Sequence, residues 1–308
     1  MFRITGFANS GSSTQWIQAM AIARVVDRLQ QYALLMRLDK PIGAFLLLWP
    51  TLWSLWLAGA GQPSQQVVII FLLGVFLMRS AGCVINDVAD RDFDPHVART
   101  RERPLAARRV SLREALGLFV GLCLTAFALV LALNTLTILL AVAGALLTAT
   151  YPFMKRFHYL PQAHLGAAFG WSIPMAFAAL TGAVPAVGWI LFAANIVWSI
   201  VYDTQYAMTD RADDLKIGLK SSAIWFGDRD KEIVAYLQIL VLLLLLIVGL
   251  MAGLGPVYYF GLFVAVWFSL YQQYLMRDRE PASCFKAFLN NNWFGLAVFA
   301  GLALDLLP

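Results

Sequence analysis

The stretch IVAYLQILVLLLLLIVGLMAG, residues 233–253, decides the class of this protein, because it contains no charged side chain. A helix rises 1.5 Å per residue, so a run of about 20 apolar residues crosses the roughly 30 Å hydrocarbon core of a bilayer. Residues 115–133 form a second such run. Of all 308 residues only 13% are charged, about half the share found in soluble domains. The sequence therefore predicts an all-α integral membrane protein surrounded by a lipid bilayer.

Apolar runs recur along the chain and predict nine transmembrane helices in a single domain that covers residues 37–308. The predicted spans are residues 41–58, 67–85, 115–133, 135–152, 163–181, 185–203, 233–252, 256–274 and 286–306. Residues 1–36 precede this domain. We expect residues 1–13 to be disordered, and the alternating apolar and basic positions of residues 16–36 favour a helix that lies at the membrane interface.

The distribution of Lys and Arg predicts the orientation. The connections after the first, third, fifth and seventh spans contain neither residue type, at 59–66, 134, 181–184 and 252–255. The other connections and the N-terminal segment carry nearly all the cationic side chains. The positive-inside rule therefore places the N-terminus in the cytoplasm and the C-terminus outside. The net charge of +5 follows this topology, so it indicates no nucleic-acid partner, and no protein partner is implied.

A first acidic motif, NDVADRDFD, occupies residues 86–94 at the inner end of the second span. If the helix continues through the motif, Asp87, Asp90 and Asp94 lie within about 60° of one another, and Asn86 can join them. Asp92 points the opposite way. Converging carboxylates need a cation, and hard oxygen ligands without His or Cys favour Mg²⁺. The alternative is a solvated, charged helix end.

A second acidic motif, YDTQYAMTDRADD, occupies residues 202–214 and continues the sixth span. Asp203, Asp210 and Asp214 lie within about 40° on one helical face, with Tyr206 beside them. Two carboxylate clusters at one membrane face suit a diphosphate substrate, because Mg²⁺ bridges carboxylate and phosphate oxygens and makes the diphosphate a better leaving group.

Cationic side chains that could assist at the diphosphate follow several of the spans. Each of them is equally well explained as a cytoplasmic loop charge. They are Lys155 and Arg156 after the fourth span, Lys216 and Lys220 after the second motif, and Arg99, Arg101 and Arg103 in the string RTRERP.

The two motifs together resemble those of the UbiA superfamily of intramembrane prenyltransferases. Within it, RLDKPIGAFLLLWPTLWSLW at 37–56, MRSAGCVINDVADRDFD at 78–94, RTRERPL at 99–105 and YPFMKRFHYLPQ at 151–162 are similar to the bacterial group that prenylates 4-hydroxybenzoate in ubiquinone biosynthesis. One departure is Ala106-Ala107-Arg108, where that group usually has a glycine or small-residue turn.

This resemblance implies nine helices around a central cavity in the bacterial inner membrane, with the active site on the cytoplasmic side. It implies a Mg²⁺-dependent transfer from polyprenyl diphosphate to the ring carbon ortho to the hydroxyl of 4-hydroxybenzoate. The residues that the family uses for metal and diphosphate carry over to Asn86, Asp87, Asp90, Asp94, Asp203, Asp210 and Asp214.

Arg79 is singled out by its depth in the second span, two helical turns before Asn86 and on the same face. An arginine at that depth is costly and should face the interior with a partner. It could bind the carboxylate of an aromatic acid, or it could snorkel to the interface or pair with a motif aspartate. Arg37 is a second candidate for either role. Trp49, Trp53 and Trp56 could line a prenyl channel, although packing against neighbours is the commoner role of such a stripe.

Two alternatives stay open from the sequence. A sibling prenyltransferase would use another acceptor, such as homogentisate, haem or a glycerol-phosphate lipid. A transporter or channel is the alternative from another class, but it would place acidic residues near the bilayer midplane on discontinuous helices, whereas these lie at one membrane face.

Overall fold

The computed structural model describes residues 13–96, 100–218 and 220–307, and these form helices and their connections without a strand. Disorder was expected for residues 1–13; residues 1–12 and Arg99 lie outside the described residues, and Ser13 begins helix α1. The helices are α1 (Ser13–Leu35), α2 (Ile42–Ala58), α3 (Gln65–Asp90), η1 (Asp94–His96), α4 (Leu112–Val130), α5 (Thr135–Thr150), η2 (Tyr151–Arg156), α6 (Pro161–Gly170), α7 (Ser172–Thr181), α8 (Ala186–Ile217), α9 (Ser222–Phe226), η3 (Gly227–Arg229), α10 (Asp230–Ala252), α11 (Pro256–Met276) and α12 (Pro281–Asp305).

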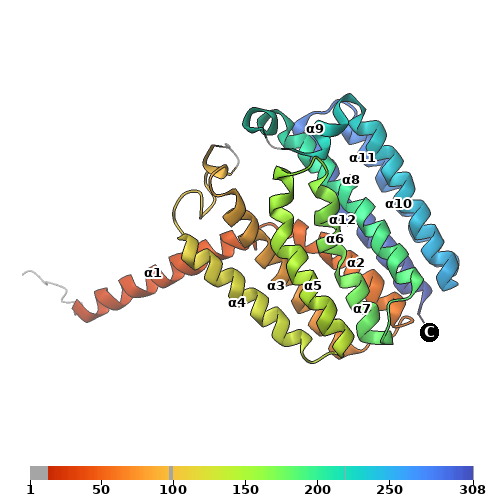
Figure 1. Ribbon diagram of the computed structural model, residues 1–308, viewed down its shortest axis with the longest axis horizontal. Helices are drawn as coiled ribbons and strands as arrows, with labels where there is room; N and C mark the ends of the chain where they lie inside the picture. Colours follow the sequence, from red (N-terminus) through yellow and green to blue (C-terminus); the bar gives the residue numbers. More distant parts are fainter. Residues whose placement is uncertain (1–12, 97–99, 219, 308) are drawn as a thin grey trace, which may run out of the picture.

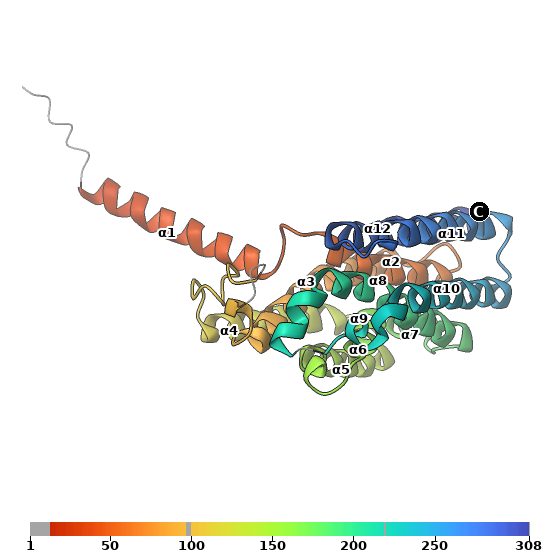
Figure 2. The same cartoon turned by 90° about the horizontal axis from the view of Figure 1, so that it is seen from above.

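The long helices form one bundle, and α1 projects away from it (Figures 1 and 2). Among the described residues, seven helical stretches are long and apolar enough to cross a membrane. Helix α2 is apolar but shorter, with 17 residues, and α11 carries Tyr and Gln side chains that lower its hydropathy. The fold is thus an all-α bundle of membrane-spanning type.

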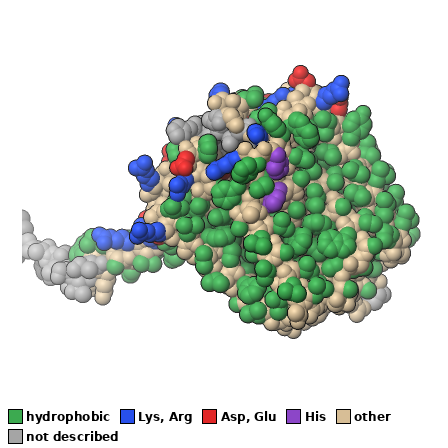
Figure 3. All heavy atoms as spheres, viewed as in Figure 1, with side chains coloured by type: hydrophobic (Ala, Val, Ile, Leu, Met, Phe, Trp, Pro, Cys, Tyr) green, Lys and Arg blue, Asp and Glu red, His purple; other side chains and the backbone are tan. Residues whose placement is uncertain are grey.

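The surface of the bundle agrees with a lipid environment. Large apolar side chains are exposed around it, among them Leu250 on α10 and Phe260 and Phe263 on α11. Figure 3 shows a largely hydrophobic face, on which the Lys, Arg, Asp and Glu side chains gather toward one end and along α1. Water would penalise so much apolar surface, whereas hydrocarbon does not.

The predicted span 163–181 is two helices rather than one. Helices α6 and α7 meet at Trp171, and Pro174 lies in the first turn of α7. Proline has no N–H to donate to the carbonyl four residues earlier, and its ring crowds that carbonyl, so the helix bends here. Trp171 lies at this bend, and its Nε1 donates to the Leu140 carbonyl of α5 at 2.7 Å.

The largest core cluster joins α2, α7, α8, α10, α11 and α12. Trp53 of α2 stacks at a tilt on Trp198 of α8, with ring centroids 5.2 Å apart. Its Nε1 donates to the Gly295 carbonyl of α12 at 3.1 Å. The aromatic stripe of α2 therefore packs against neighbouring helices at this position, which is the commoner of its two interpretations.

Helices α3 and α8 carry the two acidic motifs to the same end of the bundle. Helix α8 runs through the whole second motif to Ile217, as predicted. The prediction that the α3 helix continues through Asp94 is wrong, because α3 ends at Asp90 and Asp94 begins the short helix η1. The chain turns after Asp90, and this turn, rather than helical periodicity, decides where the Asp94 carboxylate points.

Candidate active site

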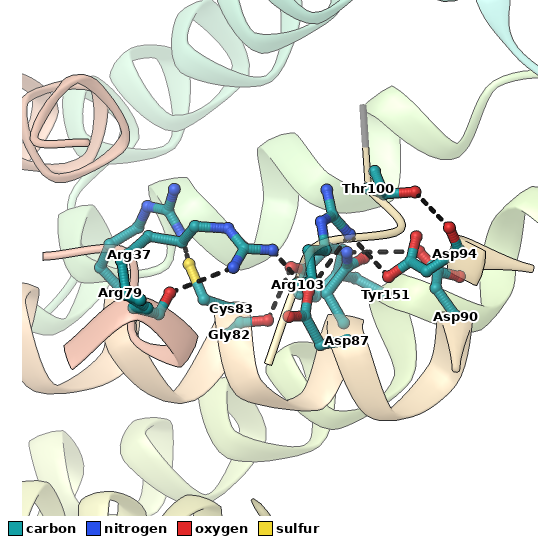
Figure 4. Close-up of polar contacts among 12 residues, drawn as sticks. Arg37, Arg79, Gly82, Cys83, Asp87, Asp90, Asp94, Thr100, Arg103 and Tyr151 are labelled. Atoms are coloured by element: carbon teal, nitrogen blue, oxygen red, sulfur yellow. Dashed lines mark hydrogen bonds and ion pairs between the residues drawn. The ribbon is translucent and has the colours of Figure 1, made fainter. Parts of the chain in front are cut away.

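Asp87 lies in the last turns of α3 and is the centre of a buried ion cluster (Figure 4). Its Oδ1 accepts from Arg37 Nη2 at 2.6 Å and from Arg103 Nη1 at 3.2 Å. Only 1% of the Asp87 side chain is exposed, so its charge is stabilised by these two guanidinium groups instead of by water. Oδ2 of Asp87 is also buried and has no hydrogen-bond partner among the described residues.

Arg103 connects the loop after α3 to the helix itself. The same Nη1 atom donates to Asp94 Oδ2 at 2.9 Å, and Thr100 Oγ1 donates to the Asp94 carbonyl at 2.9 Å. Burial raises the pKa of Asp94, although the Arg103 guanidinium opposes this effect. Burial alone would lower the pKa of Arg103, but the Asp87 and Asp94 carboxylates outweigh it and raise that pKa. Arg103 therefore stays charged.

The other side chains of the first motif fall into two groups, one at the site and one on the surface. Asn86 Nδ2 donates to Asp90 Oδ2 at 3.3 Å, and Asp90 is buried. Asp92 is exposed and pairs with Arg91 at 3.4 Å. The geometry thus brings Asn86, Asp87, Asp90 and Asp94 together and leaves Asp92 outside.

The second motif, like the first, lies near Tyr151. Asp203, Asp210 and Asp214 are half-buried along α8. Tyr151, at the start of η2, lies within electrostatic range of Asp87 and Asp90 on α3 and of Asp203 on α8. Its hydroxyl donates to the Gly82 carbonyl of α3 at 3.1 Å. Tyr151 therefore lies near carboxylates of both motifs.

Tyr206 of the second motif lies near two arginines of the candidate site. Its ring packs edge-on against Phe288 of α12, with centroids 5.0 Å apart. Arg103 lies within electrostatic range of the Tyr206 hydroxyl, as does Arg79.

A chain of buried amides fixes α8 at the level of the second motif. Gln205 Nε2 donates to Gln272 Oε1 of α11 at 3.0 Å, and Asn291 Nδ2 of α12 donates to Gln205 Oε1 at 2.6 Å. Gln238 of α10 donates to the same Gln272 oxygen at 2.7 Å. Because unpaired amides are costly in a buried site, these bonds set the rotation of α8 and hence the direction in which Asp203 and its neighbours point.

Arg79 lies deeper on α3, and its guanidinium contacts the Cys83 thiol. Its Nε atom is buried and has no hydrogen-bond partner among the described residues. The side chain runs against the backbone of α2 at Gly43, where a Cβ atom would overlap the guanidinium. Within the described residues no carboxylate pairs with Arg79, whereas Arg37, the second candidate, pairs with Asp87.

The remaining predicted cations are scattered. The Arg156 guanidinium donates to the Ala89 carbonyl of α3 and lies over the Phe93 ring, 5.4 Å from its centroid, so it borders the site. Lys216 is exposed and pairs with Asp213 at 3.0 Å. Lys220 reaches the Phe157 carbonyl, and the side chain of Lys155 lies outside what the structure describes.

The donor atoms fit a hard divalent cation that shares its ligands with a substrate. The side chains of the acidic motifs offer carboxylate and amide oxygens, and Asp87 Oδ2 is a buried acceptor that no described group uses. Across the described ranges, no three His, Cys, Asp or Glu side chains converge closely enough to hold a metal ion alone. Mg²⁺ is commonly bound through one or two carboxylates together with substrate phosphates.

Two residues of the site were not identified as such from the sequence. Arg103 stood only as one cation of a loop string, and nothing in the sequence separates it from the neighbouring Arg99 and Arg101. Tyr151 begins the string YPFMKR, but an aromatic residue at a helix end is too common to mark a site.

Comparison with known proteins gives concordant results. Residues 47–296 match the UbiA prenyltransferase family. The chain is 63% identical to the 4-hydroxybenzoate octaprenyltransferase of Nitrosococcus oceani, over 91% of this chain and 99% of the relative. It is 60% identical to the protein of that name from Methylococcus capsulatus, over 92% and 97% of the two chains.

Solved structures share the fold. The apo structure of a UbiA homolog from Aeropyrum pernix K1 superposes with a TM-score of 0.75 at 25% identity, covering 85% of this chain and 98% of that one. A UbiA homolog from Archaeoglobus fulgidus bound to GPP and Mg²⁺ superposes with a TM-score of 0.67 at 20% identity. The match covers 87% of this chain and 99% of that one. This chain therefore belongs to the UbiA prenyltransferase family.

Proposed function

We propose that the protein transfers a polyprenyl group from an allylic polyprenyl diphosphate to the ring carbon ortho to the hydroxyl of 4-hydroxybenzoate, a step of ubiquinone biosynthesis. The observation that carries this proposal is the 63% identity to 4-hydroxybenzoate octaprenyltransferase over 91% of the chain. The site supports it, because two carboxylate motifs and two half-buried arginines lie at the same end of an apolar bundle.

The diphosphate is held between α3 and α8. Asp87, Asp90 and Asp94 on one side and Asp203, Asp210 and Asp214 on the other would hold Mg²⁺. Bound there, Mg²⁺ supplies charge that neutralises the diphosphate as it leaves. Asn86 orients Asp90 through its 3.3 Å hydrogen bond.

Arg37 and Arg103 provide the remaining positive charge. Both guanidinium groups pair with the Asp87 carboxylate in the structure. Guanidinium groups also bind phosphate oxygens through paired N–H donors. Both can turn donors toward the diphosphate while the carboxylate keeps them in place. The C–O bond to the prenyl chain then breaks with its electron pair on the diphosphate oxygen, which leaves an allylic cation.

The cation is intercepted by the acceptor ring. Arg79 binds the acceptor carboxylate through its guanidinium, which pairs with no carboxylate among the described residues. The ring carbon ortho to the hydroxyl attacks the cation, a C–C bond forms, and the ring regains aromaticity by losing its proton. The apolar bundle excludes water, which would otherwise capture the cation.

The membrane arrangement is part of the proposal. Helices α2, α3, α4, α5, the α6–α7 pair, α8, α10, α11 and α12 are the nine spans, and the site faces the cytoplasm of a bacterial inner membrane, with the C-terminus outside. Helix α1 lies on the cytoplasmic interface. Its exposed Ile22, Val26 and Leu29 enter the lipid, and Arg28 is tied to the Arg109 carbonyl at 2.5 Å.

A reconstitution experiment tests the activity. Purified protein is incubated with labelled octaprenyl diphosphate, Mg²⁺ and a panel of aromatic and lipid acceptors, and the products are identified by mass spectrometry. We expect a prenylated 4-hydroxybenzoate and loss of product with EDTA. Preferential prenylation of homogentisate, haem or a glycerol-phosphate lipid would assign the chain to a sibling reaction instead.

A further inference from the structure

We propose that Asp230, at the start of α10, is a positioning residue that holds the inner end of α8 in place for its Asp210 and Asp214 carboxylates. Asp230 acts through Arg211, which lies between those two aspartates in the second acidic motif. This inference rests on the proposed function, because Asp210 and Asp214 are among the side chains that hold Mg²⁺ there. It adds what keeps these two side chains pointing toward the metal.

Helix α8 needs support at its inner end because it is much longer than a membrane crossing. Its 32 residues extend about 48 Å at 1.5 Å per residue, whereas the hydrocarbon core is about 30 Å thick. Amide hydrogen bonds from α11 and α12 fix the helix at Gln205. Asp214 lies nine residues further on, about 14 Å along the helix axis. The end of α8 that carries Asp210 and Asp214 therefore needs a second support.

Asp230 is the centre of a second buried ion cluster, apart from that of Asp87. Its side chain is 0% exposed, and its Oδ2 accepts from Arg211 Nη1 of α8 at 3.3 Å. Arg279, in the connection between α11 and α12, pairs with the same carboxylate, with Nη2 2.8 Å from Oδ1. A buried carboxylate is costly unless such partners compensate its charge. One side chain thus joins α8, α10 and the α11–α12 connection.

The backbone beside Asp230 is shaped to hold the two arginines. The connection between α8 and α10, which contains α9 and η3, lies at one end of the bundle (Figure 1). In it, Gly227 has a φ of +59°, which glycine adopts readily, and its carbonyl accepts from Arg211 at 3.3 Å. Arg279 has a φ of +55°, which is unfavourable for a non-glycine residue and persists only where surrounding contacts impose it.

The place of Arg211 on α8 links this cluster to the carboxylates of the second motif. At 100° per residue, Arg211 lies about 100° around the helix from Asp210 and about 60° from Asp214. Because side chains on one helix keep their angular relation, a guanidinium held against α10 fixes the direction of both carboxylates. In the first motif Arg103 contacts the carboxylates directly, whereas here the arginine belongs to the motif and its carboxylate partner comes from α10.

The alternative role for such a cluster is to stabilise the fold alone. Arg279 offers the comparison that separates the two roles, because it pairs with the same carboxylate but belongs to the α11–α12 connection and not to an acidic motif. Removing Arg279 leaves the pair of Asp230 and Arg211, and removing Arg211 leaves the pair of Asp230 and Arg279. A role in the fold alone treats the two arginines alike, whereas the positioning role depends on Arg211.

Hydrogen exchange of backbone amides in the purified full-length protein, without substrate or metal, tests the positioning directly. Asp230→Asn and Arg211→Gln are compared with the wild type, and Arg279→Gln is the matched control. We expect each of the first two variants to speed exchange over residues 207–217 of α8 by about tenfold or more, because exchange reports local opening of a helix. Exchange over residues 190–203 should stay as in the wild type, and the control should leave both segments unchanged.

Metal affinity supplies a second readout, which a role in the fold alone does not move. Mn²⁺ binding is measured by electron paramagnetic resonance in the presence of a non-hydrolysable prenyl diphosphate analogue. Asp230→Asn and Arg211→Gln should each raise the Kd of Mn²⁺ by about tenfold, the lower end of the effect found for residues that orient metal ligands. The double variant should be no weaker than the weaker single variant, because both substitutions break the same contact. Arg211→Lys keeps the charge and should recover part of the loss.

Unchanged exchange over residues 207–217, or unchanged Mn²⁺ affinity, in both variants overturns the inference. Additive losses in the double variant, or an equal loss in Arg279→Gln, also overturn it. Arg211→Gln keeps the test decisive if Asp230→Asn fails to fold, because the Arg211 side chain is 28% exposed and Asp230 retains Arg279. The exchange measurement uses no substrate, so a failure of the proposed function would appear only in the turnover assay.

Discussion

Removing the guanidinium of Arg79 should specifically weaken binding of the acceptor. In Arg79→Ala the protein loses a contact to the Cys83 thiol and an Nε that has no partner among the described residues, so little folding energy depends on this side chain. A hydrogen bond to a charged group contributes about 1.5–3 kcal/mol. We therefore expect the KM for 4-hydroxybenzoate to rise by about ten- to 150-fold, while the KM for the diphosphate changes little.

The assay is steady-state prenyl transfer with each substrate varied in turn. Arg79→Lys keeps the charge but loses the planar fork, so its KM should fall between those of the wild type and Arg79→Ala. With 4-hydroxybenzamide, which lacks the negative charge, the KM values of the wild type and the two variants should differ far less. A loss that falls mainly on the diphosphate, or on the Mg²⁺ requirement, would refute the acceptor role and make Arg37 the next residue to examine.

Three further predictions concern the metal cluster, the loop arginine and the orientation. Asp90→Asn should lower transfer by at least about tenfold, whereas Asp92→Asn should be nearly neutral, and equal losses would contradict the facial arrangement. Arg103→Ala should raise the KM for the diphosphate by about tenfold or more, but Arg109→Ala, which breaks an exposed pair with Glu102, should change it less than about fivefold. In a variant without native cysteines, new cysteines at positions 62, 182 and 254 should be labelled from outside intact cells and those at 104 and 218 only after permeabilisation; outside labelling at 104 would reverse the orientation.

Hydropathy and helical periodicity predicted much of this fold because both are local properties. The run at 233–253 falls almost wholly in α10, and the second motif is helical throughout, so its facial arrangement follows from the sequence. The α6–α7 break and the end of α3 at Asp90 were not predicted, because the first depends on Pro174 and a tertiary hydrogen bond, and the second on the loop that Arg103 holds.

The sequence singled out the acidic residues of the candidate site by their spacing. It named Arg37, Arg79 and Arg156 among several cationic candidates, but it did not separate Arg103 from the other loop charges. A carboxylate in a motif has a recognisable spacing, whereas a single arginine at a cytoplasmic membrane face looks like any topology charge. Only the tertiary structure separates Arg103, which binds Asp87 and Asp94, from Lys216, which pairs with a neighbour on its own helix. The amides that fix α8, such as Gln205 and Asn291, likewise come from helices far apart in sequence.

The most direct test of the central claim is whether metal and diphosphate bind together between α3 and α8. Mn²⁺ can replace Mg²⁺ as a paramagnetic probe, and its binding can be followed by electron paramagnetic resonance with and without a non-hydrolysable prenyl diphosphate analogue. Because the described carboxylates do not form a complete metal site by themselves, we predict weak Mn²⁺ binding alone and much tighter binding with the analogue, accompanied by coupling to phosphorus. Both effects should be lost in Asp87→Asn and in Asp203→Asn. Tight Mn²⁺ binding that is independent of the analogue, or coupling that survives both substitutions, would contradict the account.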